Sequence, residues 1–405
     1  MCWRYTGAEP LVSGSSLARL TCSGRHFHGR PPNLVSNQID ELRDFFKMIF
    51  SKSSDLLACI LVLAGTATQA EPVKVNVMNF IAAQTAMQFD SYQKQAGGVN
   101  KVLNIREPVA IDNQPTIRLN RDTLYSFMVV DISKGATITL PDAGSRYRSM
   151  MVVNEANYIN AVYLDGGRHE LTKEEFGSDH VFIGIRTLVD SNSSGDIKAV
   201  HKLQDAIGIE AKSATPFTAP DYDQTSYKAT LDPLLDLGKG VPDSTGWFGS
   251  KEDTTPIGHL IGTAVGFGGL PQKHAFYLNV NPGLPVGEYQ LTAKDVPVRA
   301  FWSVSLYNDN GYFQKNPEGA YNFNSVNAEK NSDGSITINF GGCDDSRVNC
   351  LPIMEGWNYG VRLYEPEKAI LDGSYIFPSV AEVTSAGASQ GSRQDVTLRG
   401  DPFSY

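Results

Sequence analysis

The sequence contains few of the residues that carry metal or thiol chemistry. Its 405 residues include five cysteines, seven histidines and four tryptophans. There is no C-x2-C pair of the kind that binds zinc, no EF-hand loop, and no P-loop lysine after the glycine-rich stretch 262–269. The sequence therefore predicts no metal and no cofactor, and it leaves open whether the protein is an enzyme.

The chain also lacks an apolar run long enough to span a membrane, which takes about 20 residues. The run Leu56–Gly65 is about ten residues long, within the roughly 7–15 of a signal-peptide core. Lys52 precedes it, and Thr68-Gln69-Ala70 follows with a small-x-small pattern. We therefore predict a signal peptide over residues 48–70, cut near Ala70, and a periplasmic or secreted protein without a stable membrane span after cleavage. An uncleaved anchor is the alternative.

Residues 1–47, upstream of this segment, show no sustained hydrophobic period. Cys2, Cys22 and His26 are scattered through them without the spacing of metal ligands. We expect this segment to be a mis-assigned start or a non-folded extension. A cytoplasmic or membrane-proximal extension is the alternative.

Clusters of basic residues are absent as well. The whole chain has a net charge of −9. Without residues 1–70, which hold seven Lys/Arg and five Asp/Glu, 28 basic and 39 acidic residues remain, a net charge of −11. Nucleic acids and anionic membranes attract basic surfaces. The charge therefore argues against both classes of partner.

Only Cys343 and Cys350 follow the predicted cleavage site. An isolated pair so close together in an oxidising compartment favours a disulfide. A loop of about eight residues would contribute roughly 2.5 kcal/mol by the chain-entropy estimate. Two free thiols are the alternative.

The 335 residues after Ala70 suggest two domains of about 100–200 residues each. Short runs of β-branched and aromatic residues, separated by turns, extend from 116 to 189 and resume at 275, whereas 194–262 has helical periodicity. This pattern predicts a mainly β fold of two antiparallel sandwiches joined by a helical connector. The expected parts are an N-terminal sandwich over 71–193, the connector over 194–270, a C-terminal sandwich over 271–380 and a tail over 381–405.

Several sequence blocks resemble a known family. They are NRDTLYS (120–126), DISKG (131–135), LPDAGSRYRSM (140–150), GTAVGFGGLPQKHAFYLNV (262–280), RAFWSVSLYN (299–308), NSDGSI (331–336), NCLP (349–352) and GVRLYEP (360–366). Through these blocks the chain resembles exported bacterial proteins that pair two domains of unknown function, DUF 1254 before DUF 1214. The resemblance covers roughly residues 75–380.

The resemblance implies two jelly-roll-like sandwiches joined by helices, in a layout similar to that of peptide:N-glycosidase F. It implies no settled activity. The chain departs from the family pattern at Cys350, where a tryptophan is common, and at Phe267, which also replaces a tryptophan. The cysteine at position 350 is consistent with a local disulfide. It also weakens any role that the family pattern would give to a tryptophan at this position.

The densest polar cluster is at a strand entrance and contains Asn120, Arg121, Asp122 and Tyr125. The two charged residues suit a carboxylate or sugar ligand, and Tyr125 suits stacking or proton donation. A structural role is the alternative, in which Asp122 caps a turn and Arg121 pairs internally.

A second cluster follows a strand in the C-terminal region and contains Trp302, Tyr307 and Asp309. An aromatic face followed by polar loop residues suits a carbohydrate platform, although Trp302 in the core and a simple turn are the alternative. Arg362 lies on a predicted strand face with Tyr364 and needs an anionic partner, which is a ligand, Asp309 or a residue near Glu365.

These residues support two hypotheses for the function. The first is a binding or assembly protein whose site lies at the domain interface and takes a small molecule, glycan, peptide or envelope component, with oligomerisation left open. The alternative is a periplasmic hydrolase that uses an Asp/Glu pair, by analogy with the architecture of peptide:N-glycosidase F. An enzyme is expected to place such a pair at one pocket, whereas a binding protein is expected to show aromatic residues and arginine without it.

Overall fold

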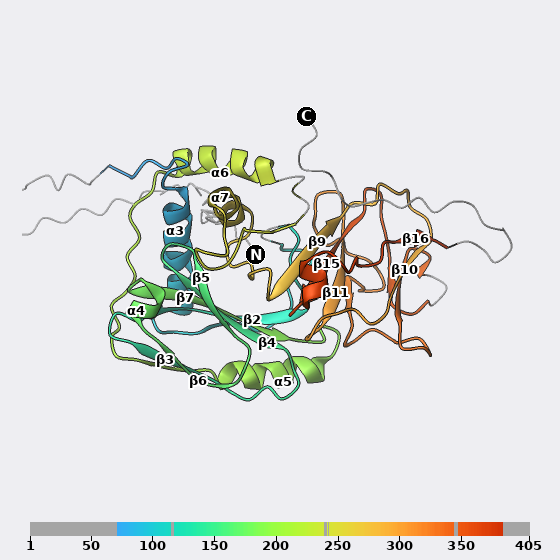
Figure 1. Ribbon diagram of the computed structural model, residues 1–405, viewed down its shortest axis with the longest axis horizontal. Coiled ribbons are helices and arrows are strands. Elements are labelled where there is room, and N and C mark those ends of the chain that lie inside the picture. The colour runs from blue at the N-terminus through green and yellow to red at the C-terminus, as the bar shows by residue number, and fades with distance from the viewer. Residues whose placement is uncertain (1–70, 115–116, 239–240, 242, 344–346, 384–405) are drawn as a thin grey trace, which may run out of the picture. The chain divides into compact units, whose positions relative to one another are not determined.

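The computed structural model describes residues 71–114, 117–238, 241, 243–343 and 347–383. This described part has 16 strands and six helices and is mainly β, as the sequence predicts (Figure 1). The predicted signal peptide 48–70, the upstream segment 1–47 and residues 384–405 of the predicted tail lie outside the described residues.

The N-terminal half, residues 71–265, is built around a five-stranded antiparallel sheet. Its strand order is β1 (Leu103–Ile105), β2 (Thr123–Asp131), β7 (His180–Leu188), β4 (Arg148–Asn154) and β5 (Ile159–Tyr163). Strands β2, β7 and β4 are buried along their whole length. Both faces of the sheet are therefore covered by other parts of the chain.

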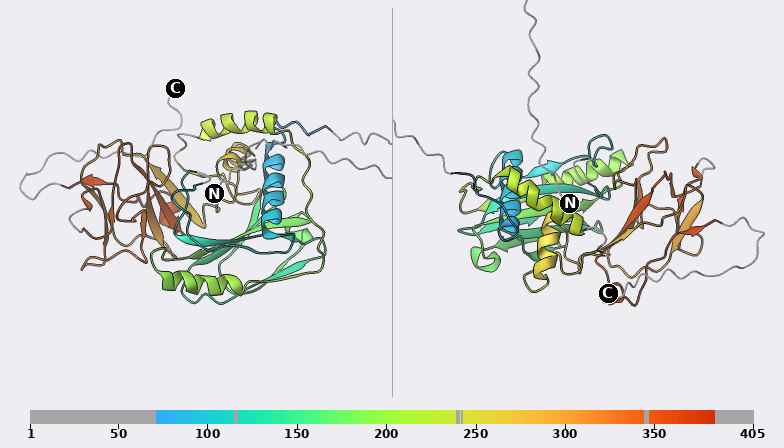
Figure 2. Two further views of the ribbon diagram at one scale, coloured as in Figure 1. Left: turned by 180° about the vertical axis from the view of Figure 1, so that it is seen from behind. Right: turned by 90° about the horizontal axis from the view of Figure 1, so that it is seen from above.

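A three-stranded sheet covers one of these faces. Its order is β6 (Gly167–Leu171), β3 (Ala136–Leu140) and β8 (Gly208–Ala211). Met128 and Ile183 of the large sheet share a core with Ile138 of β3. Helix α5 (Ser194–Asp205) lies on the same face (Figures 1 and 2). The segment predicted as a helical connector thus contains strand β8 in addition to its helices.

Helix α3 (Phe80–Ala96) covers the opposite face of the large sheet (Figure 1). Its Tyr92 ring lies 4.8 Å from the ring centroids of both Phe127 and Phe182. Helices α6 (Gln224–Gly238) and α7 (Pro256–Val265) pack on α3 through an apolar cluster. After α7 the chain passes back over the sheet, and Phe267 contacts Phe182 at a ring distance of 5.2 Å.

Local sequence explains where α7 begins. The Thr255 side chain accepts a hydrogen bond from the Gly258 N–H, and Pro256 occupies the first helical turn, where no intrahelical N–H partner is needed. Two further helices, α4 (Lys173–Phe176) and α8 (Lys368–Leu371), are single turns. No helix within the described ranges is both long and apolar enough to cross a membrane.

The C-terminal half, residues 275–383, is a sandwich of two four-stranded sheets. One has the order β12 (Asn322–Asn324), β11 (Trp302–Tyr307), β15 (Asn358–Tyr364) and β9 (Ala275–Val280). The other has the order β14 (Cys350–Leu351), β13 (Ile336–Phe340), β10 (Tyr289–Ala293) and β16 (Ala381–Glu382). All strand pairs are antiparallel except β13 with β14. Trp357, Tyr359 and Phe340 lie in the core between the two sheets.

The outer face of the β12-β11-β15-β9 sheet is polar and packs against the N-terminal half. Along β11, Ser303 and Ser305 alternate with the core residues Trp302 and Val304, yet all of them are buried. The Ser303 hydroxyl donates to Asp122 at 2.6 Å. The two sandwiches therefore meet through paired polar side chains, and the described residues from Pro72 onward belong to one compact unit.

A disulfide joins Cys343 to Cys350, with a Cα–Cα distance of 5.5 Å. It connects the chain just after β13 to the start of β14. The predicted pairing is confirmed, and it closes the segment that leads into the parallel strand pair.

Candidate functional site

A small cavity lies on the face of the large sheet that α3 covers. Its volume is about 10 Å³, which is room for about one water molecule. The lining residues come from three strands, from α3 and from the loop after α7: Tyr92, Tyr125, Phe127, Met151, Phe182, Gly184, Arg186, Phe267 and Gly268. The wall is therefore mostly aromatic, with a single arginine.

Strand register explains how the cavity forms. Gly184 of β7 lies between Phe127 of β2 and Met151 of β4. A Cβ at Gly184 would come within 3.4 Å of both the Met151 methyl carbon and the Phe182 ring. Because glycine has no side chain, the centre of this row stays open. Glycine inside a strand often marks such a close approach.

The next row across the same strands is polar. Arg186 of β7 lies opposite Tyr125 of β2 and Ser149 of β4. The guanidinium carbon of Arg186 lies 5.5 Å from the Tyr125 ring centroid. This distance permits a cation–π interaction between the two side chains.

Arg186 is a buried cation without an acidic partner. The residue is 5% exposed, and its Nη2 donates to the Gly268 carbonyl, whereas Nη1 has no hydrogen-bond partner. No carboxylate of the described residues forms an ion pair with it. Burial alone lowers the pKa of Arg186, but the Tyr125 and Tyr277 hydroxyls raise it, so the side chain stays charged.

Two more buried donors lie nearby. The Tyr147 and Ser149 hydroxyls are close to each other, and neither bonds any other group of the described residues. Burial raises the pKa of Tyr147, while the neighbouring Ser149 hydroxyl and the charge of Arg186 act in the opposite direction. Buried polar groups in proteins are nearly always paired. Arg186 lines the cavity, and its unpaired Nη1 with the two hydroxyls nearby suits an acceptor that carries negative charge.

The C-terminal half contributes to the surroundings of this site. Tyr364 of β15 and Tyr277 of β9 belong to the same apolar cluster as the cavity wall. The Tyr364 ring stacks on Phe301 at 4.2 Å and lies 5.2 Å from the Tyr147 ring. The cavity therefore lies in the N-terminal half, directly beside the contact between the two sandwiches.

Two of the sequence-predicted site residues belong to this region. Tyr125 lines the cavity. The Asn120 amide donates to the hydroxyls of Tyr125 and Tyr364, at 3.1 Å each. Asn120 therefore positions two tyrosines that surround Arg186, although it does not line the cavity itself.

Asp122, Tyr307 and Arg362 form a neighbouring network that is paired internally. Asp122 is fully buried and accepts from Ser303 and from Asn322, at 2.6 and 2.8 Å. Burial raises its pKa, and the charge of Arg362 opposes this effect.

Arg362 donates to the Tyr307 hydroxyl at 2.8 Å and to the Arg118 carbonyl at 2.9 Å. It also donates to Ser305 of its own sheet at 2.9 Å. Arg362 was expected to pair with an anion. Its hydrogen-bond partners are instead carbonyl and hydroxyl oxygens, and Asp122 acts on it through its nearby charge. These contacts join the two halves, so a role of these three residues in ligand binding stays a prediction.

The remaining three predicted residues lie in other surroundings. Trp302 is 4% exposed and packs on Phe377 in the C-terminal core, so the sugar platform proposed for its ring has no open face. Asp309 is in an exposed turn and accepts from the Asn310 amide. Arg121 donates to the Val109 carbonyl and lies over the Tyr321 ring.

The sequence analysis missed Arg186, Tyr147 and Ser149. One indication was available: Arg186 and Gly184 interrupt the apolar run 181–189 and fall on the same strand face as Phe182. A buried arginine and a glycine on the same face of a strand are a pattern that favours a ligand-binding site. The missing information was which side chains from other strands lie beside them.

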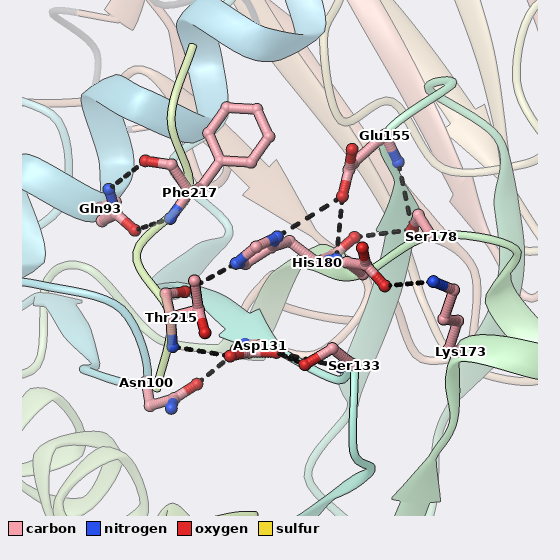
Figure 3. A network of polar contacts seen from close by, with 11 residues as sticks. Gln93, Asn100, Asp131, Ser133, Glu155, Lys173, Ser178, His180, Thr215 and Phe217 are labelled. Carbon is pink, nitrogen blue, oxygen red and sulfur yellow. Dashed lines mark hydrogen bonds and ion pairs between the residues drawn. The ribbon is translucent and has the colours of Figure 1, made fainter. Parts of the chain in front are cut away.

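A second polar network fastens the segment 213–217 to the large sheet (Figure 3). His180 lies between Glu155, whose oxygen is 3.5 Å from Nδ1, and the Thr215 carbonyl, 2.8 Å from Nε2. The Thr215 N–H donates to Asp131 at 2.7 Å. The Gln93 side chain bonds both backbone groups of Phe217. These groups pair with one another, so this network has a structural role.

No acidic pair is found at the cavity. Neither Asp nor Glu is among its lining residues, and the described residues contain no group of three or more His, Cys, Asp or Glu that could hold a metal ion. The arrangement offers donors and aromatic surfaces. It does not offer the two carboxylates of a glycosidase-type mechanism.

Two family models match this chain. Residues 99–176 match the model of DUF1254 and residues 284–368 that of DUF1214, each described as a protein of unknown function. The resemblance inferred from the sequence, with DUF1254 before DUF1214, is confirmed. Tyr125, Tyr147 and Ser149 lie within the first matched region, whereas Arg186 and Phe267 lie between the two regions.

Two solved structures are similar to this chain. The VPA0106 protein from Vibrio parahaemolyticus is 18% identical with a TM-score of 0.58, and the match covers 76% of this chain and 98% of that one. At this identity the likeness supports the fold alone. An uncharacterised protein from Burkholderia cenocepacia is 12% identical with a TM-score of 0.45, over 75% and 88% of the two chains. No curated protein matches the chain.

Proposed function

We propose that this protein binds a small molecule, or one group of a larger glycan, peptide or envelope component, at the Arg186 cavity beside the contact of its two sandwiches. The observation that carries the proposal is the buried Arg186 in an aromatic wall, with its Nη1 unpaired and no acidic partner among the described residues. Ligand sites are typically apolar and aromatic with a few convergent polar groups.

Binding accounts for the cavity better than hydrolysis does. The aromatic wall and the arginine match what was expected of a binding protein, and the lining contains no carboxylate that would act as acid or base. No specific contact favours the hydrolase, so the binding function is the one proposed.

We also propose that the protein acts outside the cytoplasm, in the periplasm or as a secreted protein. The signal-peptide pattern over residues 48–70 and the Cys343–Cys350 disulfide support this location, because disulfides persist in oxidising compartments. A ligand would then come from the cell envelope or its surroundings.

Thermal unfolding with a panel of glycans, peptides, lipids and small metabolites tests the binding function. A ligand at about 100 times its Kd stabilises the native state by about 2.7 kcal/mol. We expect the purified protein to respond to one chemical class. We expect Gly184→Val to remove that response, because the added side chain fills the cavity between Phe127 and Met151.

Ile183→Val is the matched control, since Ile183 is adjacent on the same strand and faces the opposite core. This change costs about 0.5–1.5 kcal/mol of stability and should leave the ligand response intact. A response that Gly184→Val keeps would place the site elsewhere and refute the proposal.

A further inference from the structure

The electrostatics of the cavity restrict what it binds. Arg186 brings a full positive charge into a region that is sealed from solvent by tyrosine and phenylalanine rings. A buried charge without a partner is costly, and proteins normally compensate it with an opposite charge. Here no described side chain provides one, so a ligand is the natural source of the compensating charge.

The hydrogen-bonding groups agree with the charge. Arg186 Nη1 is buried and has no partner, and the buried Tyr147 and Ser149 hydroxyls, which can also donate, bond no described group except each other. Arg186 and Ser149 are directly opposite each other in the sheet register. An acceptor between them would receive up to three hydrogen bonds, and bonds to charged groups are the stronger kind.

The size of the cavity restricts the ligand further. About 10 Å³ holds roughly one water-sized group. A sugar ring or a phosphate group does not fit into this volume. A halide ion or one oxygen of a carboxylate does.

A single water molecule would also fit and would satisfy some of the donors. It would leave the charge of Arg186 uncompensated, which an anion does not. The cation–π contact with Tyr125 stabilises the guanidinium by about 0.5–2 kcal/mol, but the ring carries no net charge. The anion is therefore the better partner.

We propose that Arg186, with the Tyr147 and Ser149 hydroxyls beside it, binds a small monovalent anion in this cavity, either a halide ion or a carboxylate of the size of formate. This inference rests on the proposed function and names the chemical class that the cavity accepts. The negative charge lies against Arg186, and the two hydroxyls donate to it.

The experiment measures thermal unfolding of the purified protein in sodium chloride, sodium formate and sodium gluconate at equal ionic strength. Gluconate is the reference anion, because its six-carbon chain is too large for a cavity of about 10 Å³. We expect chloride or formate to raise the Tm above its value in gluconate, with saturation as the concentration rises. A larger effect of formate identifies a carboxylate site, and a larger effect of chloride identifies a halide site.

Arg186→Met removes the charge and keeps the length of the side chain. We expect its Tm to be the same in all three salts. In gluconate it is expected to be at least as stable as the wild type, because replacing a buried charge by an apolar group is often neutral or stabilising. Tyr147→Phe removes one donor and should weaken anion binding about tenfold or more while keeping the fold.

The outcomes separate this inference from the proposed function. Equal salt responses of wild type and Arg186→Met, or no response in either, would overturn the anion site. If a neutral glycan or peptide from the panel stabilises both proteins equally, the binding function stands and the anion site fails. If the anion stabilises only the wild type and no organic ligand binds, the anion site stands and the proposed function fails.

Discussion

At the scale of single residues, buried polar groups have two different roles in this protein. Those around Asp122 and Arg362 are paired within the chain and join the two halves. Those around Arg186 are only partly paired, and Arg186 itself lines a cavity. The sequence grouped Asn120 and Tyr125 in one polar cluster, and the structure places both beside Arg186, while their role in ligand binding stays a prediction. The sequence did not show which polar residues join the two halves and which surround the cavity. Asp122 and Arg186 are distinguished by the neighbours that distant strands bring to them, and these are not visible in the local sequence.

Removing the Asp122 carboxylate should destabilise the protein strongly. Asp122→Ala leaves the buried Ser303 and Asn322 donors without their acceptor, and each such loss costs about 1–3 kcal/mol. We expect the free energy of unfolding to fall by about 2–5 kcal/mol in urea denaturation. Asp309→Ala, in an exposed turn, is the control and should change stability by less than about 0.5 kcal/mol. Equal stability of the two variants would refute the structural role of Asp122.

Gly341 should be far less tolerant of substitution than Gly334. Both have positive φ, +72° and +83°, so alanine costs about 1–2 kcal/mol at either position. A Cβ at Gly341 would also lie 2.0 Å from the Gly287 carbonyl oxygen, whereas nothing lies within 4 Å at Gly334. We expect Gly341→Ala to lose at least about 2 kcal/mol more than Gly334→Ala in urea denaturation. Similar losses would show that the backbone shifts freely at Gly341.

At the scale of elements, the segment 213–217 is fastened to the large sheet by side chains (Figure 3).

Sequence periodicity predicted the helices and many of the strands, because the apolar pattern of a helix or strand is local. It did not predict strand β8, which lies in a region that looked like a helical connector. The β8–β3 pairing depends on a strand far away in the sequence.

His180 should make stability depend on pH. Burial alone lowers its pKa, but Glu155, the Thr215 carbonyl and the charge of Asp131 raise it above 6.5 overall. The folded state therefore binds a proton more tightly than the unfolded state, so this contribution is complete below about pH 6.5 and is lost as the pH rises through the folded pKa.

The measurement is the free energy of unfolding from pH 5 to pH 9 for the wild type and His180→Gln. We expect the difference between the two proteins to be largest at the acidic end and to shrink as the pH rises. Contributions of titrating groups that do not interact with His180 cancel in this difference, whereas those of Glu155 and Asp131 are part of it. A difference that is constant or grows with pH would contradict the protonated His180 pair.

At the scale of the whole molecule, the N-terminal sheet is buried on both faces and the C-terminal sandwich contacts its neighbour through a polar sheet face. The predicted two sandwiches and the disulfide are confirmed. The alternation of apolar and polar residues along β11 and β15 was readable from the sequence. The sequence did not reveal that the polar face is also buried, because burial there comes from Asp122 and Asn120 in the other half.

The account predicts that the two halves unfold together. Their contact consists of buried, paired polar groups, and leaving such groups unpaired is costly. Asp122→Ala should therefore lower the stability of both sandwiches, including the one that does not contain the mutation.

The central claim is that the cavity beside Arg186 binds a small anion. Its most direct test is a crystal structure of the protein soaked in bromide, with anomalous diffraction used to locate the ion. The account predicts an anomalous peak within hydrogen-bonding distance of Arg186 Nη1 and the Tyr147 and Ser149 hydroxyls. A cavity without such a peak, in crystals where bromide is seen at other sites, would contradict it.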